Sequence, residues 1–283
     1  ADVFDSEASL TKLENEYANL SIRNEQYQVT APQDGYIVKA LKAGIGETIK
    51  EGVLRWNLAF EKAGFKNAMV VKVQPDDADW DAGDIRYNVL RWTSSPQPPF
   101  GGYGPSFVNP RTGQILGADI MLEFVHRRGV AFYEKLFISP TADSYFEEKE
   151  QNKHFAQNDQ LKYCSLGQLM HENNMFGSTA LLVNDASPIE IEGMKKESLI
   201  NLIMHEVGHT LGLNHNMKSS QLMSPAQLAD KNYIQGKSLT GSVMDYEAIN
   251  VTNDKLNQGH YFSTTIGPYD YWAIEFGYKP VTT

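Results

Sequence analysis

The length of 283 residues is enough to bury a large core without covalent staples, so no small disulfide-rich class is required. The formal net charge of -10 and the absence of any Lys/Arg block argue against a nucleic-acid partner, because that binding depends on clustered positive charge. No apolar run approaches the roughly 18 residues that a transmembrane helix requires, so we expect no membrane span in this chain.

The first half of the sequence predicts strands and one helix. Residues 1–34 are polar and acidic, and we interpret them as an arm or as the end of a preceding domain. Apolar residues recur at helical spacing from Thr48 to Ala63, and a glycine follows where that helix would end. Runs rich in β-branched and aromatic residues predict strands at 68–74 and 85–92. Two strand-like runs flank a turn signal within 101–124, which indicates a hairpin.

The second half begins with a mixed pattern and then returns to a strong helix. Charged, helical-looking pieces without a sustained strand occupy residues 126–191, and we interpret this segment as an insert. From about Met194 to Gly212, an i, i+4 stripe of apolar residues predicts a helix with one buried face. No repeat, low-complexity tract or convincing linker divides the chain. Strands alternating with helices therefore predict an α+β or α/β fold.

The most informative segment is HEVGHTLGLNH, residues 205 to 215. Positions four apart share one face of a helix, so His205 and His209 can present two imidazoles to one metal, with Glu206 beside them to activate a water. Gly212 can adopt the left-handed conformation that ends a helix, which allows the chain to bring back His215 as a third ligand. Three imidazoles plus a water are the open arrangement of a catalytic zinc site.

The length of this motif decides how specific it is. A bare HExxH is common by chance, but the extended form with a glycine and a third histidine at fixed offsets is far stronger. The alternative is a set of ordinary surface or core histidines on a helix, which is disfavoured because three of only seven histidines fall at these offsets. The string HENNM at 171–175 begins like the same motif but ends in Met, so we discard it.

A second signal is the string SVMDY at residues 242–246. Together with the long histidine motif it resembles the Met-turn of the metzincin zinc peptidases, in which a Met side chain forms an apolar floor beneath the metal. The resemblance implies that Met244 is this floor. It also implies that Tyr246 can ligate the zinc or swing to stabilise the transition state, as the matching Tyr does in astacins and serralysins. A Tyr that only packs the turn is the alternative for Tyr246.

The residues around both motifs indicate which metzincin family the chain resembles. Asn216 follows the third histidine, so we do not assign the chain to astacins, serralysins, matrixins or adamalysins. Other stretches resemble a large bacterial group of envelope-associated zinc-dependent metalloproteases, known mainly through domains of unknown function. This resemblance covers most of residues 47–280, and it implies an extracytoplasmic location (periplasmic, cell-envelope or secreted) and a longer full-length protein. Besides SVMDY, the similar stretches are EGVLRWNLAFEKAGF (51–65), IRYNVLRW (85–92), YGPSFVNPRTGQIL (103–116), LGLNHN (211–216) and GPYDYWAIEFGYKP (267–280).

The resemblance also implies an architecture. We expect a metzincin-like catalytic domain over 35–283, whose upper lobe at about 35–215 carries a twisted, mixed five-stranded sheet and the active-site helix. A smaller, irregular lower lobe at about 216–283 is expected to end in a helix near 269–276. The strand at 102–108 is expected to be the antiparallel edge above the zinc, where an extended peptide adds as a further strand.

These observations predict a zinc-dependent endopeptidase in which Glu206 takes a proton from the attacking water and delivers it to the leaving amine. Its partner is a peptide or protein substrate, whose identity and cleavage specificity the sequence leaves open, as it does the oligomeric state. Two alternatives stay open: a zinc-retaining peptide-binding or scaffold protein without turnover, and a metallohydrolase of a non-peptide substrate. The intact Glu206 disfavours the scaffold.

An acidic run at residues 76–84 raises calcium as a second metal. Its carboxylates stand at nearly alternate positions of a turn and can converge on a hard cation. A solvated acidic loop is the favoured interpretation, because Gly83 does not stand where an EF-hand loop requires its glycine. The carboxylates are those of Asp76, Asp77, Asp79, Asp81 and Asp84.

Overall fold

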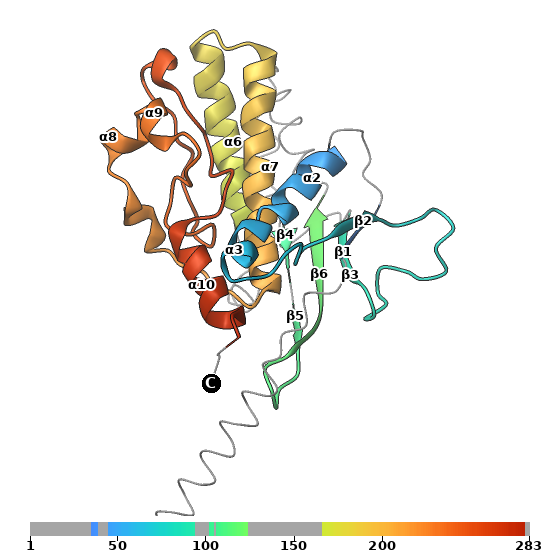
Figure 1. Cartoon of the computed structure of the whole chain (residues 1–283). Helices are drawn as coiled ribbons and strands as arrows, with labels where there is room; N and C mark the ends of the chain where they lie inside the picture. The colour runs from blue at the N-terminus through green and yellow to red at the C-terminus, as the bar shows by residue number, and fades with distance from the viewer. Residues whose placement is uncertain (1–34, 39–44, 94–101, 105, 124–165, 281–283) are drawn as a thin grey trace, which may run out of the picture.

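The structure, a computed structural model, describes residues 35–38, 45–93, 102–104, 106–123 and 166–280 (Figure 1). The predicted arm at 1–34 and the larger part of the predicted insert lie outside these residues, and the division into two lobes stays a prediction. None of the helices in the described ranges is long and apolar enough to cross a membrane.

Six described strands form a mixed sheet: β1 (Gly35–Val38), β2 (Val71–Val73), β3 (Asn88–Thr93), β4 (Gly102–Tyr103), β5 (Ser106–Val108) and β6 (Ile115–Glu123). They lie in the order β2-β1-β3-β6-β4, and β5 also pairs with β6. Strands β2, β1, β3 and β6 pair in parallel, whereas β4 and β5 run antiparallel to β6. The predicted combination of helices with a mixed sheet is confirmed. The predicted count of five strands is not, because six are described.

The predicted hairpin is formed by β5 and β6. The backbone N–H of Asn109 donates to the carbonyl of Gln114 over 2.8 Å, and Gly113 closes the turn with a φ of 75°. This left-handed conformation favours glycine, which explains the turn signal in the sequence. The two strands predicted before the hairpin are present in shorter form as β2 and β3.

The longer helices are α2 (Ile45–Leu54), α3 (Asn57–Lys62), α6 (Leu166–Val183), α7 (Pro188–Thr210) and α10 (Pro268–Tyr278). Short helical turns lie between α7 and α10: η3 (Ser219–Leu222), α8 (Pro225–Leu228), α9 (Lys231–Ile234) and η4 (Lys255–Asn257). Figure 1 shows α7 between the sheet on one side and the C-terminal segment on the other. Helix α7 therefore contacts both parts of the described fold.

The single helix predicted over Thr48–Ala63 is divided into α2 and α3 at Trp56. The backbone N–H of Trp56 donates to Val53 three residues earlier instead of completing the α-helical ladder. Its buried indole N–H donates to the carbonyl of Met204 in α7 over 2.9 Å. The tryptophan thus anchors the junction of two helices to α7, which a periodicity of apolar residues cannot show.

The sequence does not predict helix α6, which lies within the segment interpreted as an insert. Its apolar pattern is interrupted by polar residues, one of which, Asn174, is buried and donates to the buried Ser198 hydroxyl of α7 over 2.8 Å. Leu166 and Met170 are fully buried in the same core as Met194 of α7. The described part of the predicted insert therefore belongs to the hydrophobic core.

Helix α7 begins six residues before the predicted start. Ser187 and Glu190 form a capping box, in which Ser187 Oγ accepts from the Glu190 N–H over 3.3 Å and Glu190 Oε2 accepts from the Ser187 N–H over 2.8 Å. Pro188 stands at the first helical position, where its missing N–H costs no hydrogen bond. This start signal is present in the sequence, but the apolar stripe begins only at Met194.

Candidate metal centre

The last turns of α7 hold the first residues of the site. His205 and Glu206 are fully buried, and His209 is partly buried one turn further along the same face. The helix ends at Gly212, whose φ of 84° confirms the predicted left-handed position. The chain then reverses and brings His215 back toward α7, so the local sequence alone assembles these side chains.

The three predicted histidines converge. One ligand nitrogen from each of His205, His209 and His215 lies within 4.8 Å of the other two. The Nε2 atoms of His209 and His215 are 3.0 Å apart. Among the described His, Cys, Asp and Glu side chains, these three form the group that can hold a metal ion.

The outer nitrogens of two imidazoles are fixed by backbone carbonyls. His205 Nδ1 lies 2.7 Å from the carbonyl oxygen of Val243, and His209 Nδ1 lies 2.9 Å from that of Leu213. A carbonyl oxygen only accepts, so each Nδ1 carries the hydrogen and each Nε2 keeps a lone pair. This arrangement orients both rings as metal-binding histidines require.

Electrostatics keep the three rings neutral. Burial, and secondarily the neighbouring His209, lowers the pKa of His205 well below its ordinary value. Burial also lowers the pKa of His209, and burial with the nearby His209 lowers the pKa of His215 to about 4. The imidazoles are therefore uncharged near neutral pH, which is the form that binds a metal.

The donor set fits zinc. Three neutral imidazoles, two of them with a hydrogen-bonded outer nitrogen, suit Zn²⁺, which binds His at about 2.0–2.1 Å and keeps an open position in catalytic sites. Nothing in the described residues adds a fourth His, Cys, Asp or Glu to the group. The three histidines thus correspond to an open three-ligand centre.

Glu206 lies between the helix and the edge of the sheet. Gly104, directly after β4, is so close that a Cβ built on it would lie 2.5 Å from the carbonyl oxygen of Glu206 and 3.2 Å from its Oε2. A side chain at position 104 would therefore displace the backbone or the carboxylate of Glu206. The described part of the predicted edge strand at 102–108 forms β4 and β5, both antiparallel to β6, and its Gly104 lies beside the predicted general base.

Met244 of the SVMDY string packs against α7. It is fully buried, and a Cβ built on Gly208 would collide with its sulfur and lie 3.0 Å from the Trp56 ring. The absence of a side chain at Gly208 therefore makes room for the thioether against α7. The role of Met244 as an apolar floor beneath the metal stays a prediction.

The turn that carries Met244 is fixed by Asp270, which sequence reasoning missed. Asp270 accepts hydrogen bonds from Ser242 Oγ at 2.5 Å, from the Val243 N–H at 2.9 Å and from the Gly267 N–H at 2.7 Å. Burial raises the pKa of Asp270, while the hydrogen bonds from Ser242, Val243 and Gly267 lower it. Its position in the first turn of α10 indicates only a helix cap, so the sequence could not reveal a partner 28 residues earlier.

Tyr246 faces the histidines. Its ring centroid lies 4.8 Å from that of His215 and 5.6 Å from that of His205. The turn that carries Tyr246 is bonded to the residue after His215, because the N–H of Asn216 donates to the carbonyl of Met244 over 2.9 Å. The ring is therefore close to the centre, as a direct role requires.

The acidic run at 76–84 forms local contacts instead of a converging cluster. Asp81 Oδ1 accepts from the Gly83 N–H over 2.6 Å, and Asp84 pairs with Arg86 at 2.5 Å. The hydrogen bond from Arg86 lowers the pKa of Asp84 to about 2. In these described residues no three carboxylates meet, so calcium gains no support.

Comparison with known proteins reaches the same part of the chain. Residues 188–283 match the family model described as Met-zincin. No curated protein and no solved structure matches the chain. The matched region contains α7, the three converging histidines, the Met244 turn and α10. Residues 188–283 are therefore similar to the Met-zincin family, and the three converging histidines lie within this matched region.

Proposed function

We propose that the chain is a zinc-dependent endopeptidase with His205, His209 and His215 as metal ligands and Glu206 as general acid and base. The observation that carries this proposal is the convergence of three neutral imidazoles within 4.8 Å, next to a buried glutamate on the same helix. The Met-zincin match over this region supports it.

The chain's own groups have distinct tasks in this proposal. Zinc, when bound, supplies a Lewis acid that polarises a carbonyl and lowers the pKa of water toward neutrality. Glu206 takes the proton of the attacking water and delivers it to the leaving amine. The carbonyls of Val243 and Leu213 keep two imidazoles oriented throughout. The Tyr246 hydroxyl stabilises the negative charge that develops on the carbonyl oxygen.

The substrate in this proposal is an extended peptide that lies along β4. This strand ends the order of the sheet, and its neighbour β6 already pairs with it on the other side. A peptide can add to such an edge through backbone hydrogen bonds, with little regard for sequence. Gly104 at the end of β4 would place the peptide backbone beside Glu206. The resemblance to envelope-associated bacterial proteases supports an extracytoplasmic place of action.

Substitution of the base tests this function. Glu206→Gln keeps the shape of the side chain but cannot accept the proton, so casein hydrolysis should fall by at least about 10²- to 10⁴-fold. Zinc content, measured by elemental analysis, should remain at one per chain in this variant and be lost in His209→Ala.

Each outcome separates the alternatives. A zinc-loaded wild-type chain that binds casein without cleaving it would favour the scaffold. Cleavage of small esters or amides alone would favour a non-peptide hydrolase. Wild-type rates in Glu206→Gln would show that another base acts.

A further inference from the structure

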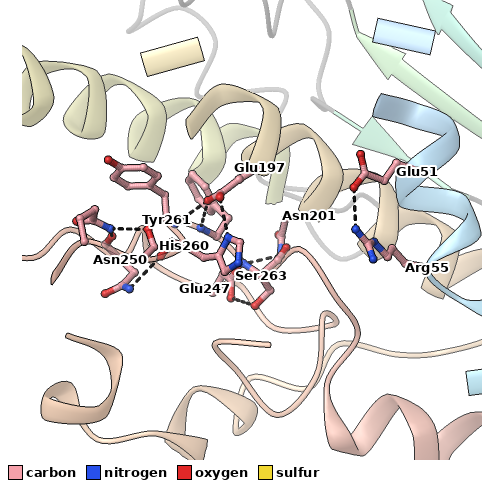
Figure 2. A network of polar contacts seen from close by, with 12 residues as sticks. Glu51, Arg55, Glu197, Asn201, Glu247, Asn250, His260, Tyr261 and Ser263 are labelled. Atoms are coloured by element: carbon pink, nitrogen blue, oxygen red, sulfur yellow. Dashed lines mark hydrogen bonds and ion pairs between the residues drawn. The ribbon is translucent and has the colours of Figure 1, made fainter. Parts of the chain in front are cut away.

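One face of α7 carries a row of polar side chains that leads to the candidate centre. Glu197, Asn201 and His205 are spaced four residues apart, so they lie above one another on the helix. Each reaches the C-terminal segment: His205 contacts the Val243 carbonyl, Asn201 contacts Glu247, and Glu197 contacts the backbone around Tyr261. Figure 2 shows the part of this row that contains Glu197 and Asn201.

The central contact of the row is the carboxylate of Glu247. The residue is buried, and its carboxylate accepts from Asn201 Nδ2 at 2.8 Å, from the Ser263 N–H at 2.6 Å and from Ser263 Oγ at 2.7 Å (Figure 2). The Glu247 backbone is held as well, because Asn173 Nδ2 of α6 donates to its carbonyl over 3.2 Å. Both ends of this residue are therefore fixed by other elements.

The hydrogen-bond partners of Glu247 are consistent with a fixed acceptor. Burial raises the pKa of Glu247 to about 7, and its hydrogen bonds from Ser263 act in the opposite direction. All three of its partners donate, so the ionised form satisfies them and a protonated oxygen would lose one of them. Such a buried carboxylate is costly unless it is fully hydrogen-bonded, and this one determines the position of its chain segment.

Tyr246 lies between two anchored points of the backbone. Before it, the carbonyl of Val243 is held by His205, and Asp270 holds the N–H of the same residue. After it, the Glu247 carboxylate is held by Asn201 and Ser263. The Tyr246 N–H donates to the side chain of the buried Asp245 over 2.8 Å, which adds a contact at Tyr246 itself. The direction of the Tyr246 ring consequently depends on both anchors.

We infer that Glu247 is a positioning residue, which, held by Asn201 and Ser263, directs the Tyr246 phenol toward the imidazoles of the metal centre. The inference rests on the proposed function of Tyr246 and extends it, because it assigns the orientation of that side chain to a buried acid remote from the metal ligands. The ring distance of 4.8 Å between Tyr246 and His215 is the geometry that Glu247 maintains.

A double-mutant cycle on the zinc-loaded chain tests the inference. Tyr246→Phe should lower kcat by roughly 10- to 10³-fold with KM and zinc content nearly unchanged, because only a transition-state contact is lost. Glu247→Gln should lower kcat by about 10-fold or more in the wild-type background. In the Tyr246→Phe background it should lower kcat no further, because the hydroxyl that it positions is already absent.

A matched control separates positioning from stability. Glu197→Gln makes the same substitution as Glu247→Gln, but in α7, one turn before Asn201 on the same face, where Glu197 accepts from the N–H groups of Tyr261 and Phe262. We expect it to lower the melting temperature without changing kcat. Ser263→Ala removes one donor to Glu247 and provides a milder variant should Glu247→Gln fail to fold. It should reduce kcat in the same background-dependent way.

A second measurement does not depend on turnover. In the zinc-loaded protein, NMR cross-peaks between the ring protons of Tyr246 and His215 should be present in the wild type and in Glu197→Gln. They should weaken in Glu247→Gln and in Ser263→Ala. A chain that shows this ring contact but cleaves no peptide would contradict the proposed function and leave the positioning role standing.

Three results would overturn the inference. The first is an unchanged kcat and ring contact in Glu247→Gln. The second is an equal loss of kcat on Glu247→Gln in both backgrounds, which would indicate a general structural defect. The third is full activity of a zinc-loaded Tyr246→Phe variant, because no hydroxyl would then need positioning.

Discussion

Two glycines determine how closely neighbouring segments approach α7. Gly104 allows the edge of the sheet to lie against Glu206, and Gly208 allows Met244 to lie against α7. A methyl group at either position would meet atoms of the candidate site, and interiors at native packing density have no room to absorb it. The distances that separate Glu206, Met244 and the end of β4 are therefore set by the absence of side chains at these two glycines.

Met244 and Gly208 give a prediction at the scale of single residues. Met244→Leu nearly conserves volume, so it should keep zinc and much of the activity and cost less than about 1.5 kcal/mol of unfolding free energy. Gly208→Ala overpacks the same contact and should cost about 1–3 kcal/mol. Denaturant titration with parallel zinc analysis measures both. Loss of zinc from a folded Met244→Leu variant would mean that the thioether does more than pack.

The residues of the candidate site differ in how far the sequence could predict them. His205, Glu206, His209, Gly212 and His215 stand within eleven residues of one another, so the geometry of one helix and one turn is enough to bring them together. The contacts of the two glycines and of the acid in α10 join segments far apart in the sequence. No local pattern records such contacts.

The elements differ in the same way, and α7 illustrates why. Its apolar stripe predicts the helix. The partners of its polar row of Glu197, Asn201 and His205 cannot be predicted in this way, because they lie in the C-terminal segment that packs against α7. Helix α6 was missed because its buried Asn174 interrupts the apolar pattern, and the partner that satisfies Asn174 lies in α7. Hydrophobic periodicity therefore fails to predict a core helix whose buried face contains polar residues.

The ion pair between α7 and the C-terminal segment gives a prediction at the scale of elements. Glu197 Oε1 lies 2.7 Å from His260 Nδ1, and this hydrogen bond raises the pKa of His260. The raised value means that the pair stabilises the fold fully below the ordinary histidine pKa of about 6.5, and this stabilisation is lost as the pH rises through the raised pKa. The contribution should not exceed about 1 kcal/mol, because the His260 side chain is 35% exposed and water screens the pair.

An NMR titration of the histidine ring protons measures this effect. In Glu197→Gln the pKa of His260 should fall toward its ordinary value, and the decline of stability with rising pH above about 6.5 should become shallower. An unchanged His260 pKa in this variant would show that Glu197 does not hold the proton.

At the scale of the whole molecule, the candidate centre joins three parts of the chain. Strand β4 supplies the edge, α7 supplies two histidines and the glutamate, and the segment after α7 supplies His215 and the turn of Met244. The unfolded chain cannot keep these parts in place, so a metal that binds all three histidines binds the folded state selectively. Metal binding is then linked to the stability of the entire described fold.

Removal and return of zinc test this linkage. At a free zinc concentration 100 times the dissociation constant, selective binding to the folded state adds about 2.7 kcal/mol to the free energy of unfolding. For a domain of this size about 1 kcal/mol shifts Tm by roughly 2–4 °C, so zinc should raise the Tm of the chelator-treated chain by roughly 5–10 °C. Glu206→Gln should show the same rise because it keeps every ligand, whereas His209→Ala should show little or none.

If His209→Ala gained as much as the wild type, zinc would be binding elsewhere on the chain and the three histidines would not form the centre. If instead both variants and the wild type gained nothing while zinc remained stoichiometric, the unfolded chain would hold the metal as tightly as the folded one, and the centre would not couple α7 to the segment that follows it.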